Sequence, residues 1–137
     1  MTLRIPRRRG AAFGLLLLAC GPTAPPLVCP EGAAVQRVQY PESEGGGYGE
    51  RCMRPDGTRH GPSRDWYGAG TLRSLTTWVN GERHGISILW HPNGAKQAEA
   101  QHDHWMPVGR WTNWDEAGQV VDERDFGATD VSASPGS

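Results

Sequence analysis

Short runs of alternating apolar and polar residues, separated by glycine-containing turns, dominate the second half of the chain. The runs 71–79 and 86–91 are rich in β-branched and aromatic residues, which are typical of half-buried strands. Asn80-Gly81 and Pro92-Asn93-Gly94 lie between such runs and favour tight turns, because Asn and Gly tolerate positive φ. No segment sustains helical periodicity, so the pattern predicts an all-β protein.

The pattern repeats with a period of 24 residues. It divides the chain into three units, 56–79, 80–103 and 104–126, in which tryptophan and glycine occupy fixed columns. The column positions are Trp66, Trp90 and Trp114; Gly61, Gly85 and Gly109; Gly70, Gly94 and Gly118; and, in the first two units, Gly57 and Gly81. Each unit reads as strand, turn, strand, turn. Three units therefore predict a single antiparallel hairpin meander of about six strands.

The turns between units are not identical in sequence. Asp56-Gly57 is expected to form the same hairpin turn as Asn80-Gly81. His104-Trp105 takes this place in the third unit, which predicts a different hairpin there.

The six tryptophans fall into two groups. Trp66, Trp90 and Trp114 share a column and are expected to stack across the repeats, because one unit cannot bury its apolar stripe alone. Trp78, Trp105 and Trp111 lie outside the column. They are expected to be exposed and are the candidate binding residues, since exposed aromatic side chains favour protein contacts or sugar stacking.

The signature G-x-x-x-G-x-x-x-x-W-x-x-x-G of these units resembles the MORN-repeat variant, whose bacterial members include YwqK-like antitoxins. Gly57, Gly61, Trp66 and Gly70 match it, as do Gly81, Gly85, Trp90 and Gly94, and in the third unit Gly109, Trp114 and Gly118. The resemblance covers residues 56–126. It implies non-catalytic β-hairpins that contact proteins and, in some cases, membrane lipid. The antitoxin group implies neutralisation of a toxin in the cytoplasm.

The N-terminal residues 1–19 predict an export signal. Basic residues precede an apolar run at 11–19, which is too short to span a bilayer and fits a signal-peptide core. Leu17-Leu18-Ala19-Cys20 resembles the lipobox of bacterial lipoproteins, which implies a lipid on Cys20 that holds the protein to a membrane. Gly21, in place of Asp, resembles an outer-membrane sorting signal. The expected location is therefore the bacterial cell envelope, with the outer membrane as one option.

The remaining segments follow from composition. Residues 20–29 predict a proline-rich tether, residues 30–55 a weakly patterned segment before the repeats, and residues 127–137 a small, polar, disordered tail. Hydrophobic residues make up 36% of the chain, beside 19 glycines and 11 prolines, which predicts a thin core. Four of the 14 basic residues and no acidic residue lie in 1–19, so the remainder carries 10 basic and 15 acidic groups, a net charge of −5. This charge disfavours nucleic-acid binding.

Cys29 and Cys52 remain once Cys20 is assigned to lipid. An even pair in an oxidising compartment favours a disulfide, which would tie the segment before the repeats to the first unit. Two free thiols or half of a metal site are the alternatives. Neither cysteine belongs to a C-x-x-C pair, which disfavours zinc.

The sequence shows no catalytic site, and no cofactor or metal site is predicted. Ser63, Ser74 and Ser87 lack a nucleophile elbow, and His60 and His84 share a repeat register that indicates a structural role. The motif His102-Asp103-His104 could place two imidazoles on one strand face, but it lacks a third ligand and is interpreted as accidental.

These observations favour a lipoprotein that displays a non-catalytic repeat sheet for protein–protein interaction in the cell envelope. The alternatives are a cell-wall or glycan-binding module and an immunity or antitoxin-like protein.

Overall fold

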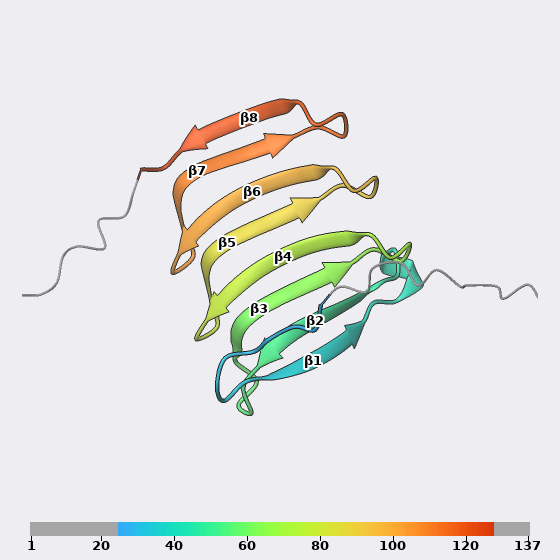
Figure 1. Ribbon diagram of the computed structural model, residues 1–137, viewed down its shortest axis with the longest axis vertical. Coiled ribbons are helices and arrows are strands. Elements are labelled where there is room, and N and C mark those ends of the chain that lie inside the picture. Colours follow the sequence, from blue (N-terminus) through green and yellow to red (C-terminus); the bar gives the residue numbers. More distant parts are fainter. Residues whose placement is uncertain (1–24, 128–137) are drawn as a thin grey trace, which may run out of the picture.

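The computed structural model describes residues 25–127, which form one open antiparallel sheet of eight strands in sequence order (Figure 1). The strands are β1 (Ala34–Gln39), β2 (Tyr48–Met53), β3 (Arg59–Trp66), β4 (Leu72–Val79), β5 (Glu82–Trp90), β6 (Lys96–Asp103), β7 (Met106–Trp114) and β8 (Val120–Asp125), with a short 3-10 turn η1 (Glu42–Glu44) between β1 and β2. The predicted all-β meander is confirmed. The export signal, Cys20 and the tail from residue 128 lie outside the described residues.

The sheet has eight strands and not the expected six, because residues 30–55 add the hairpin β1–β2 to the three repeat units. This hairpin pairs without a register shift, from Ala34 opposite Met53 to Gln39 opposite Tyr48. Its first strand is exposed at five of six positions and carries no column tryptophan, so the repeat pattern does not reveal it.

The glycine column at Gly61, Gly85 and Gly109 marks a bulge in each odd strand of the repeats. The three residues have φ angles of 109°, 91° and 62°, which side chains disfavour. Each lies at a register shift; in the second unit Thr76 pairs with Ser87, whereas Trp78 pairs with Arg83. The recurrence of one irregularity at one repeat position explains why glycine is kept there.

Two kinds of turn join the strands from β2 to β8. Five-residue loops join β3 to β4, β5 to β6 and β7 to β8, each closed by the backbone N–H of its first residue and the carbonyl of its fifth at 2.8–2.9 Å. The loop 54–58 between β2 and β3 is of this kind, so Asp56-Gly57 does not form the two-residue turn of Asn80-Gly81. The expectation of equivalent turns is wrong.

The third unit keeps the two-residue turn that its sequence argues against. His104 and Trp105 have φ angles of 48° and 71°, close to the 51° and 86° of Asn80 and Gly81. Because this turn type matches the twist of the flanking strands, the sheet imposes it on residues that disfavour it. The predicted change of hairpin is therefore wrong.

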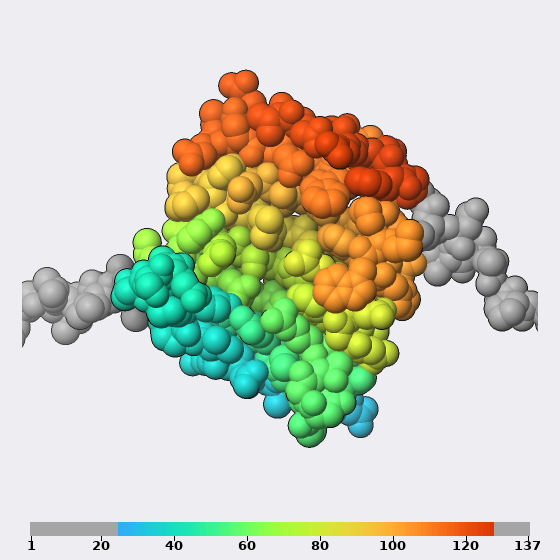
Figure 2. Space-filling view, turned by 180° about the vertical axis from the view of Figure 1, so that it is seen from behind, coloured from blue at the N-terminus to red at the C-terminus, as the bar shows by residue number. Residues whose placement is uncertain are grey.

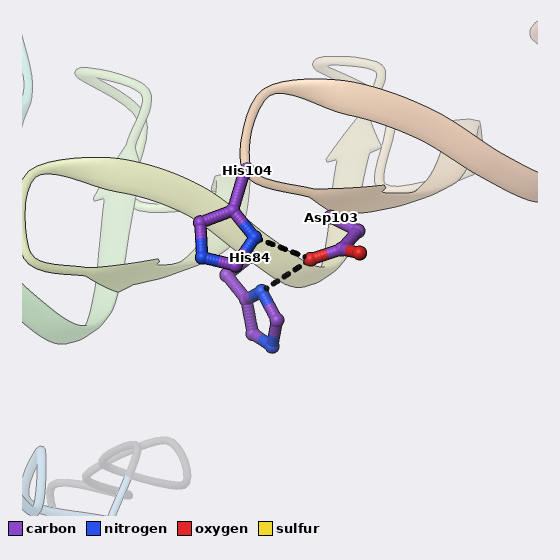
Figure 3. Close-up of side chains that lie close together, drawn as sticks. All are labelled: His84, Asp103 and His104. Carbon is purple, nitrogen blue, oxygen red and sulfur yellow. Dashed lines mark hydrogen bonds and ion pairs between the residues drawn. The ribbon is translucent and has the colours of Figure 1, made fainter. Parts of the chain in front are cut away.

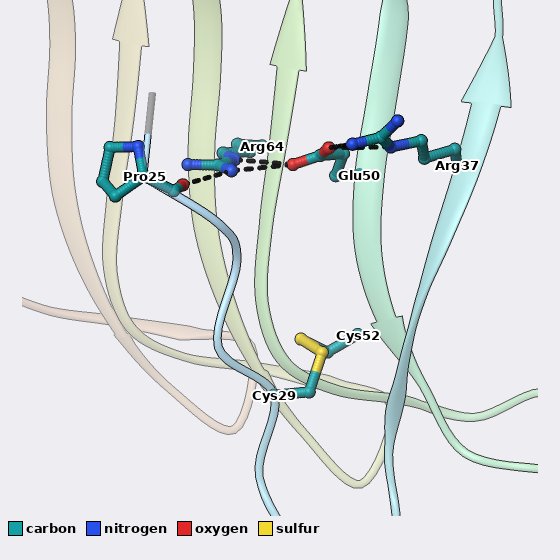
Figure 4. A network of polar contacts seen from close by, with 6 residues as sticks. All are labelled: Pro25, Cys29, Arg37, Glu50, Cys52 and Arg64. Atoms are coloured by element: carbon teal, nitrogen blue, oxygen red, sulfur yellow. Dashed lines mark hydrogen bonds and ion pairs between the residues drawn. A yellow bond between two sulfur atoms is a disulfide. The ribbon is translucent and has the colours of Figure 1, made fainter. Parts of the chain in front are cut away.

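One face of the sheet is crossed by residues 25–30, which we call the strap (Figures 1 and 4). The predicted disulfide between Cys29 and Cys52 is present and ties the strap to β2. At Gly61 a Cβ atom would lie 2.4 Å from Cδ of Pro30, so only glycine permits this close approach. We call this side the strap face and the opposite side the groove face.

The strand registers place Trp66, Trp90 and Trp114 together on the strap face. Trp66 is 6% exposed and stacks on Tyr48, with ring centroids 4.5 Å apart. The ammonium of Lys96 lies 5.3 Å from the ring centroid of Trp114. Within residues 25–127 none of the three tryptophans stacks on another, because equivalent strands lie two positions apart, about 9.6 Å. The predicted column is correct, but the predicted direct stacking is wrong.

A single layer gives a thin core. The buried apolar residues are Cys52, Trp66, Trp78, Ala98, Ala100 and Val108. In the described part of the chain no helix has the length and apolar character needed to cross a membrane.

Candidate functional site

The groove face carries a hollow of about 210 Å³ in the middle of the sheet. Figure 2 shows this face, which the strap leaves uncovered. Small side chains on β3 to β6 form the floor: Ser63, Ser74, Thr76, Ser87, Ala98 and Ala100. Each of the three serines forms a hydrogen bond to the adjacent strand. Ser74 donates to Asp65, and Ser63 donates to the Thr76 carbonyl. The hydroxyls of Ser87 and Thr76 bond each other. These hydroxyls form the floor of the hollow.

Guanidinium and indole groups alternate along one side of the hollow. The guanidinium carbon of Arg59 lies 4.6 Å from the ring centroid of Trp78, and that of Arg83 lies 5.7 Å from the centroids of both Trp78 and Trp105. The four residues come from β3, β4, β5 and the β6–β7 turn. Cation–π contacts of this kind hold the arginine side chains extended over the sheet.

The three candidate binding tryptophans differ in exposure. Trp78 is 7% exposed, and its Nε1 donates to the buried Ser63 Oγ at 2.8 Å. The expectation that Trp78 is exposed is therefore wrong, because the two arginines on neighbouring strands cover it. Trp105 is 52% exposed, and Trp111 is half-buried in the wall of the hollow. The structure thus gathers all three on the groove face, opposite the Trp66 column.

Two residues that line the hollow each have a buried polar atom without a hydrogen-bond partner, Nδ1 of His102 and Nε1 of Trp111. Their rings lie 6.1 Å apart, and His102 is 8% exposed. Burial, and next the positive charge of Arg83, lower the pKa of His102, which keeps the ring neutral near pH 7. The indole N–H only donates, and it has no acceptor among the described residues. A buried donor without a partner is costly, which marks this point as suited to a ligand.

The charges around the hollow favour an anion. Arg51, Arg59 and Arg83 line it beside a single carboxylate, Asp65. Asp65 already accepts hydrogen bonds from the Tyr40 hydroxyl and from Ser74 Oγ. Burial and the bond to Asp65 raise the pKa of Tyr40, so this phenol stays protonated and keeps donating. The arginines therefore outnumber the carboxylates, and the one carboxylate is occupied.

The strap face has a larger hollow, in which two arginines pair with one carboxylate. The carboxylate of Glu50, 5% exposed, accepts from Nε of Arg37 and Nε of Arg64, each at 2.9 Å. Arg64 also donates to the carbonyl of Pro25 at 2.7 Å, so the network fastens the strap (Figure 4). This network therefore holds the strap against the face.

The histidines group differently from the H-x-H motif. His102 points into the hollow, whereas His104 lies in the β6–β7 turn and meets Asp103 and His84 at the edge of the sheet (Figure 3). The idea of two imidazoles from one motif sharing a face is therefore wrong. The positive φ of His104 turns its side chain away from that of His102.

Sequence reasoning missed Arg59, Arg83 and His102 as members of this site. The repeat register contained the signal, because Arg59 and Arg83 are 24 residues apart, as are Trp78 and His102. Ser63, Ser87 and Trp111 share a third register, so an indole replaces a floor hydroxyl in the last unit. The hollow is thus made from the same repeat positions with different side chains.

In comparisons with protein-family models, curated proteins and solved structures, the chain matches none.

Proposed function

We propose that the protein is a membrane-anchored, non-catalytic lipoprotein of the bacterial cell envelope whose groove face binds an acidic segment of another envelope protein. The observation that carries the proposal is the hollow itself, which three arginines line together with Trp111, whose buried indole N–H has no hydrogen-bond partner. A carboxylate or peptide carbonyl supplies the acceptor that this donor needs.

A peptide segment suits the hollow better than a small molecule or a glycan. The volume of the hollow, about 210 Å³, is below the roughly 300–1,000 Å³ of small-molecule sites. Its floor of small side chains allows a peptide backbone to approach the sheet closely. Sugar rings stack on free aromatic faces, but Arg59 and Arg83 already lie over Trp78. Protein interfaces use tryptophan and arginine as their main anchors, which is the composition of this face.

The lipobox and the place of the strap support the membrane anchor. Pro25 is held on the strap face by Arg64, so a lipid tether that precedes it leaves the groove face free for a partner. A disulfide in the strap suits an exported protein, whereas an antitoxin acts in the reducing cytoplasm. The MORN-like character of the repeats belongs to this proposal, since such repeats serve in protein contacts.

The anchor is tested by metabolic labelling with a fatty-acid probe. Growing cells that express the wild-type chain are expected to incorporate the label into it, and Cys20→Ala is expected to abolish incorporation. The expected loss follows because the Cys20 thiol is the only group that the lipobox presents for lipid. An unlabelled wild-type protein would show that the chain is not a lipoprotein.

The binding face is tested by removing one donor. Trp111→Phe keeps an aromatic ring but loses the indole N–H, and a hydrogen bond to a charged group contributes about 1.5–3 kcal/mol. Binding to the envelope partner is therefore expected to weaken about tenfold or more. Trp114→Phe on the strap face is the matched control and is expected to leave binding unchanged. Retention measured by quantitative pull-down from envelope extract gives both values.

Two results would contradict the proposal. Equal binding by Trp111→Phe and Trp114→Phe would exclude the hollow as the binding site. Retention on purified peptidoglycan or polysaccharide, lost in Trp111→Phe, would replace the protein partner by a glycan.

A further inference from the structure

A second site lies at the edge of the sheet formed by the two-residue turns. We propose that His84, Asp103 and His104 bind a divalent transition-metal ion of the Zn²⁺ class. This site is separate from the hollow of the groove face, because these three side chains do not line it.

The three side chains converge on one point. Nδ1 of His104 lies 2.6 Å and Nδ1 of His84 lies 3.2 Å from Oδ1 of Asp103 (Figure 3). The three potential ligand atoms lie within 4.8 Å of one another, the one such group among residues 25–127. An ion bound at about 2.0–2.2 Å from each atom needs ligand atoms roughly 3–3.5 Å apart, so a small rotation of His104 makes the fit.

An unsatisfied atom marks the same place. Nδ1 of His84 is buried and has no hydrogen-bond partner, although Asp103 is only 3.2 Å away. The distance is short, but the direction is not that of a hydrogen bond. A metal ion between the two atoms would bond both, which removes the cost of the unpartnered nitrogen.

The other nitrogen of His104 also has a suitable neighbour. Oε2 of Glu82 lies 4.0 Å from Nε2 of His104. With Nδ1 on a metal, Nε2 carries the proton and faces this carboxylate, the arrangement that orients most metal-bound histidines. Glu82 is therefore a positioning residue and not a ligand.

The local fold explains why only one repeat junction builds the site. The positive φ of His104 brings its ring to 5.2 Å from the ring of His84, beside Asp103 at the end of β6. His60 occupies the register of His84 one unit earlier, but its Nδ1 accepts from the backbone N–H of Asn80 at 3.2 Å. His60 is thus a natural control for His84.

The donor set determines the class of ion. Two imidazole nitrogens and one carboxylate oxygen suit Zn²⁺, Cu²⁺ or Ni²⁺, whereas Ca²⁺ and Mg²⁺ prefer oxygen ligands alone. The side chains of His84, Asp103 and His104 are 45%, 29% and 64% exposed, so the proposed site lies at the surface of the sheet.

The test is calorimetric titration of the full-length, untagged chain with ZnCl₂ in detergent. We expect one Zn²⁺ per chain for the wild type and at least about tenfold weaker binding for Asp103→Asn and for His104→Asn. Asparagine at 104 keeps the tolerance for positive φ, so the turn is retained. His60→Asn is expected to bind Zn²⁺ as the wild type does, and CaCl₂ is expected to give no binding heat.

Circular dichroism establishes whether each variant is folded. If His104→Asn is unfolded, Zn²⁺ binding by Asp103→Asn tests the proposal. The proposal is overturned if the wild type shows no specific Zn²⁺ binding. It is equally overturned if Asp103→Asn binds as tightly as His60→Asn, or if Ca²⁺ binds as well as Zn²⁺.

Discussion

Replacing both Cys29 and Cys52 by serine is expected to lower the free energy of unfolding by about 3 kcal/mol. The bond closes a loop over a sequence separation of 23 residues, which restricts the unfolded chain. It also fixes the strap on β2, where Cys52 is 1% exposed. The effect is large for this protein, because a one-layer sheet has a thin core and small domains are stable by only about 5–15 kcal/mol.

Urea unfolding followed by tryptophan fluorescence measures this loss. Reductant is expected to bring the wild type to the stability of the double variant and to leave the double variant unchanged. A loss below about 1 kcal/mol would mean that the strap is held by the Glu50 network alone, through Arg64 and the Pro25 carbonyl.

Trp78→Ala is expected to lower the free energy of unfolding by about 3–5 kcal/mol, the range for a buried aromatic side chain. Trp78 is 7% exposed and fills the space between Arg59 and Arg83. Its loss also takes the donor from the buried Ser63 Oγ. The repeats are held together by few contacts of this size, so the loss affects both neighbouring strands.

Trp105→Ala is the matched control, since Trp105 also contacts Arg83 but is 52% exposed. We expect it to change stability by less than about 1 kcal/mol. Urea midpoints of the two variants give the comparison. Similar losses for both would mean that the buried position of Trp78 is wrong.

The repeat pattern was sufficient to predict the class of fold. Bulge glycines such as Gly85 recur every 24 residues, and their positive φ explains why the residue type is constrained there. Cys29 and Cys52 could be paired because they were the two cysteines left once Cys20 was assigned to lipid. Features that depend on local backbone conformation, or on the number of cysteines, could therefore be predicted from the sequence.

Features that depend on contacts between residues far apart in the sequence could not be predicted. The hairpin β1–β2 lacks the column residues, and only Gly46, 24 positions before Gly70, hints at the repeat. Burial of Trp78 depends on two arginines from other strands, which no local pattern reveals. The meeting of His84 with His104 depends on a turn with positive φ at residues that disfavour it.

The groove face has a simple origin in the repeat. Equivalent positions carry Ser63, Ser87 and Trp111, and a neighbouring register carries Trp78 and His102. Because each unit has the same strands and bulge, an indole can replace a hydroxyl at this position and form one wall of the hollow within the same sheet. A repeat fold of this kind can change what it binds by such substitutions alone.

The most direct test of the claim that the groove face binds the partner is site-specific photo-crosslinking in living cells. A photoreactive amino acid at position 105 is expected to crosslink one envelope protein, and the same group at position 86 is expected to crosslink none. Trp105 and Ile86 are each 52% exposed, but they lie on opposite faces. Crosslinking from position 86 and not from position 105, or equally from both, would contradict the account.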